Sequence, residues 1–382
     1  MANCRSGNTL QVFITNVGKF YYYIKIFAVF ETILNIIMKK VYIILDAMST
    51  GDIPNVKHYL EQFNDPNYQF TMSNHYFEYE SQQLNQYDLK YMLIDTNFTT
   101  RFHAGSEYQT ELKRRVVSAH KMGFKIVLYN LWENHQHQSH SNIASLLEQC
   151  EIETYHTLCG GRSYFWWMMY NLYNNWDHTF NHNHKPFDFL YLNKRPREAR
   201  QYLYKLLKGN TLDHSLYTWW DDNHRIKLPE QYELPQHSKE YPRMGLDQTI
   251  HPLPYEHSKI NVATETVTER TNKPFITEKI WKPIICYQPF VVLGYCHYLK
   301  DLKSMGFKTF DSVWDESYDN IIDTYQRADS IAELMQKIKN IDSDALYEQT
   351  DSIRKHNRDR FFNREIMCDV ITQDIKLAFE IY

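Results

Sequence analysis

The sequence predicts an α/β protein made of two doubly wound, Rossmann-like domains that face each other across a cleft. In both halves of the chain, short apolar runs rich in Val, Ile, Leu and Tyr alternate with helical patterns, as in parallel βαβ units. A polar stretch at 174–186, rich in Asn and His and without apolar periodicity, separates the halves and indicates a linker. The 382 residues also exceed what one hydrophobic core usually supports.

The first half, which we assign to a domain over 38–180, opens with a basic start that runs directly into a buried-type strand. Gly123 follows the helix predicted before the third strand, where a residue that adopts the left-handed conformation is favoured as a C-cap. The elements expected here are strands at 41–45, 91–94 and 125–129 and helices at 108–121, 143–158 and 163–175.

The second half restarts the pattern, and we assign it to a domain over 187–357, followed by a helix over 358–382 that is expected to cross back onto the first domain. Residues 221–257 are polar and contain proline, which predicts a long irregular insertion. Ligands of doubly wound sheets lie outside the carboxyl ends of the strands, so the cleft between the halves is the expected site. The expected elements are strands at 187–192, 216–219, 259–263 and 289–293, and helices at 198–208, 277–285 and within 320–380.

The N-terminal segment 1–37 is expected to be an upstream extension, with Met38 as the natural first residue. Its apolar run at 20–37 is interrupted by Lys25 and Glu31, so it falls short of the about 20 uninterrupted apolar residues of a membrane span. It also lacks the small-residue cleavage site of a signal peptide. The alternative is an amphipathic anchor at a membrane surface, and membrane association is expected only on that interpretation.

The charge balance and the cysteines narrow the function classes. The net charge of −4 argues against a protein whose main partner is a nucleic acid duplex, because such proteins usually carry a basic face. The six cysteines form no CxxC pair and no spacing typical of zinc ligands, which indicates reduced thiols in a cytoplasmic protein. The histidines at 174–186 lack a carboxylate partner at helical spacing, which favours solvated loop histidines over a metal site.

A first candidate anion site follows the strand at 187–192. One alternative explanation is a basic, solvated first helical turn. Cations at a helix start oppose the helix dipole, however, which favours an anion bound between them. The loop and the helix start carry four cations, Lys194, Arg195, Arg197 and Arg200.

A second candidate site opens the helix expected at 277–285. A helix N-terminus presents unpaired N–H groups and the positive end of the dipole, and both suit phosphate. Thr277 can cap this helix or donate to phosphate, Lys279 adds a positive charge, and the neighbouring carboxylates can accept hydrogen bonds from ribose hydroxyls. An N-cap with a solvated first turn would explain these residues as well. Two anion-suited sites in one domain favour a nucleotide diphosphate.

With these residues in place, the second half resembles the alpha-1,3-fucosyltransferase family (glycosyltransferase family 10) and related bacterial and phage glycosyltransferases. The resemblance rests on a strand followed by Glu265, a loop ending in Phe-Ile-Thr-Glu-Lys at 275–279, a helix, and a strand led by Pro289. The family also has an Arg at the start of the helix after the domain's first strand, and Arg200 fits that position best. The resemblance implies the GT-B fold.

The resemblance also implies roles for these residues. Arg200 and Lys279 would hold the donor diphosphate, Glu278 the ribose, and Phe275 would pack near the base or sugar. Glu265 would lie near the donor sugar. Phe275 stands where the family has Tyr, and Thr266 where it usually has Asn, so the donor need not be GDP-fucose. The residues expected to bind the nucleotide sugar are Asn193, Lys194, Arg195, Arg197, Arg200, Glu265, Phe275, Thr277, Glu278 and Lys279.

A general base is expected in the first half. The family has a Glu-Ser-Pro segment after the strand equivalent to 125–129, and Glu133 is the corresponding residue here, without the Ser-Pro part. In an inverting transfer such a carboxylate takes the proton of the acceptor hydroxyl while that oxygen attacks the anomeric carbon. A solvated loop residue is the alternative explanation of Glu133, and the substitutes for the base are Asp95, His103 and Glu107.

The sequence thus predicts an inverting glycosyltransferase, hexosyl or fucosyl, that uses a nucleotide-sugar donor and needs no metal cofactor. Basic residues take the place of the Asp-x-Asp motif with which metal-dependent GT-A enzymes hold the diphosphate. A glycan is the expected acceptor. A phage enzyme that modifies hydroxymethylpyrimidine bases in DNA is one alternative, against which the acidic balance argues. A non-catalytic carbohydrate- or nucleotide-binding protein on the same scaffold is the other.

Overall fold

The computed structural model describes residues 38–45, 53–73, 84–95, 106–130, 138–152, 156–159, 161–194, 196–220, 225–233, 248–269 and 274–380. The segment interpreted as an extension, 1–37, lies outside these residues. Within the described part of the chain, no helix combines the length and the apolar character needed to cross a bilayer.

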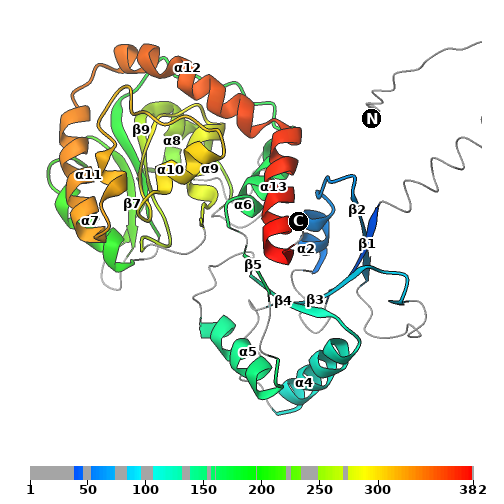
Figure 1. Cartoon of the computed structure of the whole chain (residues 1–382). Coiled ribbons are helices and arrows are strands. Elements are labelled where there is room, and N and C mark those ends of the chain that lie inside the picture. The colour runs from blue at the N-terminus through cyan, green and yellow to red at the C-terminus, as the bar shows by residue number, and fades with distance from the viewer. Residues whose placement is uncertain are drawn as a thin grey trace, which may run out of the picture.

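Five parallel strands form the first sheet, in the order β2-β1-β3-β4-β5 (Figure 1). The order reverses between β1 and β3, as in doubly wound sheets of the flavodoxin type. Residues 41–45 of β1 are all buried, as expected for a parallel strand covered on both faces. The strands are β1 (Lys39–Leu45), β2 (Tyr68–Ser73), β3 (Leu89–Asp95), β4 (Lys125–Asn130) and β5 (His156–Cys159), and the helices between them are α2 (Ile53–Leu60), α4 (Ser106–Lys121) and α5 (Gln138–Gln149).

The two outer strands of this sheet differ from the sequence prediction. The helix expected over 143–158 ends at Gln149, and the residues after it include β5, which pairs with β4 from Val127 to Asn130. The strand β2 is absent from the prediction. Both strands lie at the edges of the sheet. Pairing with the neighbouring strand, a long-range contact, defines them more than their own residue pattern does.

The second sheet has the order β10-β9-β6-β7-β8, with β8 antiparallel to β7 and the other strands parallel. Counted from β6 along the chain, this is the strand arrangement of the Rossmann sheet, and the order reverses between β6 and β9. The strands are β6 (Phe187–Leu192), β7 (Leu216–Trp220), β8 (Arg225–Ile226), β9 (Ser258–Thr264) and β10 (Phe290–Leu293). The helices are α7 (Glu198–Leu207), α8 (Pro252–His257), α9 (Glu278–Ile285), α10 (Tyr298–Ser304), α11 (Thr324–Ile338) and α12 (Ser343–Phe361).

These two sheets confirm the predicted α/β class with two doubly wound units. One part of the prediction is wrong in detail: the insertion expected to be irregular over 221–257 contains β8 and α8. Proline does not exclude a helix in this segment. Pro252 lies at the first position of α8, where a backbone N–H would have no helical partner in any case.

Helix α6 (Tyr164–Tyr173) lies buried between the two sheets. Trp166 packs against Trp281 of α9 and Phe361 of α12, with ring centroids 5.6 and 6.3 Å apart, and its Nε1 donates to the Phe361 carbonyl at 2.8 Å. A helix whose sequence is apolar around most of its circumference is stable in such a buried position. The two sheets therefore share one hydrophobic core.

The last helix, α13 (Arg364–Phe379), returns from the second unit to the first and lies beside α2 (Figure 1). The ring of Phe379 stacks on Tyr91 of β3 with centroids 4.7 Å apart, and the Tyr91 hydroxyl donates to the Phe379 carbonyl at 2.9 Å. Asp374 accepts a hydrogen bond from Arg162 Nε at 2.9 Å, just before α6. The chain end thus covers the first sheet.

We expect Phe379→Ala to lower the free energy of unfolding of the first unit by about 3–5 kcal/mol, the usual loss when a fully buried aromatic ring is removed. Leu377→Ala is the matched control, because Leu377 lies on the same helix and is 58% exposed. Urea denaturation followed by circular dichroism measures both. Equal midpoints for the two variants would contradict the docking of α13 on β3.

Candidate functional site

A pocket of about 430 Å³ lies where the order of the second sheet reverses, at the ends of β6 and β9. This is the place where doubly wound sheets bind ligands, because the loops from the two strands diverge there. Glu278 is the one carboxylate among the described residues that line the pocket. We call it the cationic pocket, since its described lining includes Lys194, Arg197, Arg200, Lys279 and Lys282.

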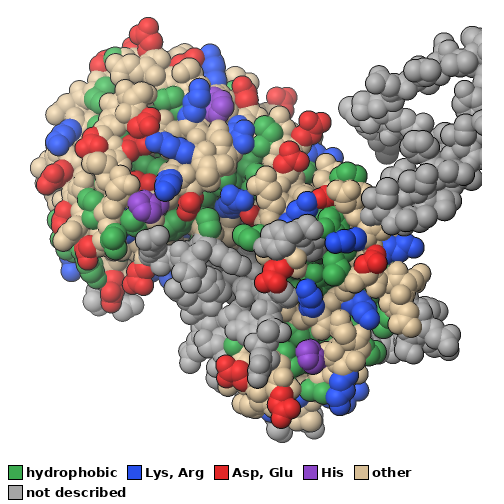
Figure 2. All heavy atoms as spheres, viewed as in Figure 1, with side chains coloured by type: hydrophobic (Ala, Val, Ile, Leu, Met, Phe, Trp, Pro, Cys, Tyr) green, Lys and Arg blue, Asp and Glu red, His purple; other side chains and the backbone are tan. Residues whose placement is uncertain are grey.

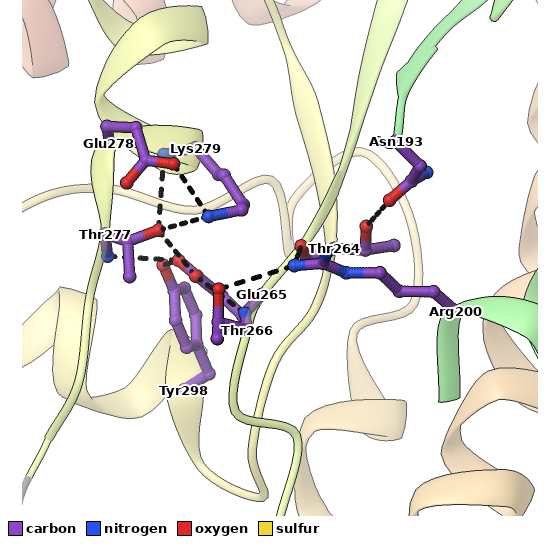
Figure 3. Close-up of polar contacts among 9 residues, drawn as sticks. All are labelled: Asn193, Arg200, Thr264, Glu265, Thr266, Thr277, Glu278, Lys279 and Tyr298. Atoms are coloured by element: carbon purple, nitrogen blue, oxygen red, sulfur yellow. Dashed lines mark hydrogen bonds and ion pairs between the residues drawn. The ribbon is translucent and has the colours of Figure 1, made fainter. Parts of the chain in front are cut away.

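Arg200 connects the two strand ends beneath the pocket. It lies in the first turn of α7, is 5% exposed, and its Nη2 donates to the Thr264 carbonyl at 3.1 Å and to Thr266 Oγ1 at 3.4 Å (Figure 3). Burial lowers the pKa of the Arg200 guanidinium from its ordinary value, and the nearby Glu265 acts in the opposite direction. An arginine stays charged in proteins, so Arg200 places a fixed positive charge at the pocket floor.

The start of α7 leaves backbone donors toward the pocket. Arg197 occupies the N-cap position, and its side chain does not cap the helix. The first N–H groups of a helix have no intrahelical partner and carry the positive end of the dipole. Arg197 and Arg200 also line the pocket, so positive charge is concentrated at this end of it.

Asn193, the residue after β6, brings a buried amide to the pocket. Its Oδ1 accepts a hydrogen bond from Thr264 Oγ1 at 2.5 Å, and its main-chain N–H donates to Thr218 Oγ1 at 3.0 Å (Figure 3). Asn193 is 3% exposed and lines the pocket, and its side chain also hydrogen-bonds to Tyr191 of β6.

Glu265 does not line the pocket, but it fixes the loop and the helix start that do. It is fully buried and accepts hydrogen bonds from Thr277 N at 3.1 Å, Thr277 Oγ1 at 2.7 Å and the Tyr298 hydroxyl at 2.7 Å (Figure 3). The expectation that Glu265 lies near the donor sugar stays a prediction: Glu265 is not among the residues that line the pocket, whereas its neighbours Thr264 and Thr266 are. Its chemical effect is to fix Thr277 at the N-cap of α9.

The first turn of α9 presents an ion pair to the pocket. Lys279 Nζ donates to Glu278 Oε1 at 2.7 Å and to Thr277 Oγ1 at 3.2 Å. Burial by itself would raise the pKa of Glu278, but the ammonium groups of Lys279 and Lys282 outweigh it, and the pKa lies below its ordinary value. Glu278 is thus a carboxylate that can accept hydrogen bonds, set beside cations that can hold an anion.

Phe275 also points away from the pocket. Its side chain is 2% exposed and packs edge-on against Phe165 of α6, with centroids 6.0 Å apart. Beside it, Ile276 N donates to the Gly161 carbonyl at 3.1 Å. The structure therefore corrects the expected position of Phe275 near base or sugar: an apolar ring at this point is drawn into the core shared by the two sheets.

Several predicted residues fall outside the described part of the chain. Glu133, Arg195 and His103 do so entirely, and only the backbone is described for Asp95 and Glu107. The strands β3 and β4, which precede Asp95 and Glu133, pair in parallel, with Asp95 opposite Tyr129.

Among the pocket residues that the sequence interpretation missed are Thr218, Thr264 and Lys282. Lys282 had a signal, since it lies three residues after Lys279 in the helix and therefore on the same face. Thr218 lies in the middle of β7 and Thr264 ends β9, and only the pairing of β6 with these two strands brings them to Asn193.

The histidines of the linker serve the fold. His178 Nε2 lies 3.0 Å from Glu256, and Lys185 Nζ lies 2.6 Å from His182 Nδ1. No group of three or more His, Cys, Asp or Glu side chains within the described residues is arranged to hold a metal ion.

Comparison with known proteins gives structural neighbours only. No protein-family model matches the chain, and no curated protein does. Among solved structures, a mutant of phage T4 BGT in complex with UDP-glucose is 12% identical and covers 90% of this chain and 100% of its own, with a TM-score of 0.37. A crystal structure of alpha1,3-fucosyltransferase is 11% identical and covers 83% and 90%, with a TM-score of 0.36. The strand orders of the two sheets give the chain the GT-B architecture.

We expect Glu265→Gln to lower the free energy of unfolding of the second unit by about 2–3 kcal/mol. The carboxylate now accepts hydrogen bonds from Thr277 and Tyr298, and the amide nitrogen of glutamine cannot accept them. Glu269→Gln, at an exposed position four residues later, is the control. Thermal unfolding measures both. A melting temperature equal to that of the control would show that the three contacts to Glu265 do not stabilise the loop.

Proposed function

We propose that the chain transfers a sugar from a nucleotide diphosphate sugar to an acceptor hydroxyl. The observation that carries this proposal is the cationic pocket at the reversal point of a Rossmann-type sheet, flanked by the first turns of α7 and α9. Five cations around one carboxylate suit a ligand with several negative charges.

Glu278 favours a nucleotide over a simple phosphate. A carboxylate in an anion site repels the anion, so its presence there calls for a ligand that also offers hydroxyl donors. In a nucleoside diphosphate the ribose is attached directly to the diphosphate, and its two hydroxyls meet that requirement. The match of residues 275–279 and Arg200 to the fucosyltransferase-like pattern supports the same assignment.

The reaction we propose is a single displacement with inversion. A bond forms between the acceptor oxygen and the anomeric carbon, the bond from that carbon to the diphosphate oxygen breaks, and the nucleoside diphosphate leaves with the electron pair. Arg200, Lys279 and the helix starts would stabilise the growing negative charge on the leaving group. Glu133 is the proposed base for the acceptor proton, with Asp95 as its substitute.

We propose a glycan as the acceptor rather than DNA. The chain carries a net charge of −4, and acidic and basic side chains are interspersed on the face seen in Figure 2. A protein that binds the DNA backbone usually concentrates lysine and arginine on one face. A steep fall in affinity for DNA with rising salt would turn the proposal toward a DNA acceptor.

Lys279→Ala should weaken the binding of UDP or GDP by about 10- to 100-fold, the effect of losing one hydrogen bond between charged groups. Isothermal titration calorimetry measures the affinity, and thermal unfolding checks that the protein remains folded. The control is Lys300→Ala, a lysine exposed on α10 of the same unit. An affinity of Lys279→Ala equal to that of the unchanged protein would show that the nucleotide does not bind at Lys279.

Transfer should persist in the presence of EDTA, because protein cations take the place of a divalent ion on the diphosphate. The assay follows release of nucleoside diphosphate from the donor that binds. A loss of activity in EDTA that manganese restores would overturn the metal-independent mechanism.

A further inference from the structure

A second hollow of about 380 Å³ continues from the cationic pocket. The two share Lys194, Thr218 and Lys282 among their lining residues, so one elongated ligand can occupy both. The far part of the second hollow is walled by Trp220 and Arg225. We call it the Trp220 pocket.

Trp220 forms a fixed flat surface in this pocket. It is the last residue of β7 and pairs directly with Arg225 of the antiparallel strand β8. Residues directly opposite each other in such a pair project to the same face of the sheet. The Arg225 guanidinium accordingly lies 3.7 Å from the centroid of the Trp220 ring, and Lys194 Nζ lies 5.3 Å from it. Indole and guanidinium planes are among the protein surfaces on which nucleic acid bases stack.

The remaining walls combine apolar and hydrogen-bonding groups. Leu228 and Pro254 are apolar, whereas Thr249, His251 and Glu233 offer donors and acceptors. Burial lowers the pKa of the His251 imidazole from its ordinary value, and a hydrogen bond to the Gln231 backbone acts in the opposite direction. A planar ring with a polar edge, the shape of a nucleobase, fits such a lining.

The order of groups along the two pockets matches the order of groups in a nucleotide. Arg200 and Lys279 lie in the cationic pocket, Glu278 lies beside them, and Lys282, one helical turn after Glu278, lines both pockets. Lys194, the second residue after β6, lines both pockets as well. Phosphate, ribose and base would therefore meet cations, a carboxylate and an aromatic surface in sequence.

We propose that the Trp220 pocket binds the base of the nucleotide, stacked on the Trp220–Arg225 surface. The inference rests on the proposed function and adds to it the residues that recognise the base. On this proposal the cationic pocket holds the diphosphate and the Trp220 pocket recognises the base.

The test compares the binding of UDP, GDP and inorganic pyrophosphate by isothermal titration calorimetry. Trp220→Ala should weaken whichever nucleotide binds by about 5- to 100-fold, the usual effect of removing a stacking ring, and leave pyrophosphate unchanged. Trp220→Phe should recover most of the loss. Tyr217→Ala is the control, since Tyr217 is an aromatic residue on the same strand but on its opposite face.

The outcomes distinguish this inference from the proposed function. If Lys279→Ala weakens both nucleotide and pyrophosphate while Trp220→Ala weakens neither, the diphosphate site stands and the base pocket is wrong. Equal weakening of nucleotide and pyrophosphate by Trp220→Ala would also overturn the base pocket, because Trp220 would then act on the shape of the whole site. If the wild-type chain binds none of the three, the proposed function itself fails.

Discussion

The buried carboxylate of Glu265 is the contact on which the candidate site depends. It joins the end of β9 to the N-cap of α9 through Thr277, and to α10 through the Tyr298 hydroxyl. A buried charge is tolerated only when hydrogen bonds replace its lost hydration, and Thr277 and Tyr298 together supply three. These internal bonds hold the start of α9 with its first turn lining the pocket.

Hydrogen bonds within the protein also hold the cations of the site in place. Nη2 of Arg200 donates to the Thr264 carbonyl and to Thr266, and Lys279 is paired with Glu278. Gathering positive charges at one point costs electrostatic energy that a bound anion offsets. Preorganised charges of this kind stabilise a leaving group without reorganisation during the reaction, which is why they suit group transfer better than flexible surface lysines.

The candidate site is packed directly against the helix α6, which lies between the two sheets. The loop that leads into α9 carries Phe275 and Ile276, which contact Phe165 and Gly161 at the start of α6. Helix α9 itself packs on α6 through Trp281. The first turn of α9, which lines the cationic pocket, is therefore attached to the core between the sheets, and α13 closes that core against β3. The position of the pocket relative to the first sheet follows from apolar packing, without a contribution from the polar site residues.

The sequence by itself determined the two-sheet class, the strand β6 with its bounds, and the cluster of cations after it, because apolar periodicity and local helix-start chemistry are written in neighbouring residues. Tertiary structure decided which residues of the motif line the pocket. Glu265 and Phe275 are drawn inward by Tyr298 and Phe165, partners far away in the chain, and Thr218 and Thr264 reach Asn193 only through strand pairing. The edge strands β2 and β5 and the Trp220–Arg225 surface have the same origin. Burial and cross-strand pairing depend on residues distant in sequence, so a local pattern identifies the chemistry of a segment but not the side it turns to the ligand.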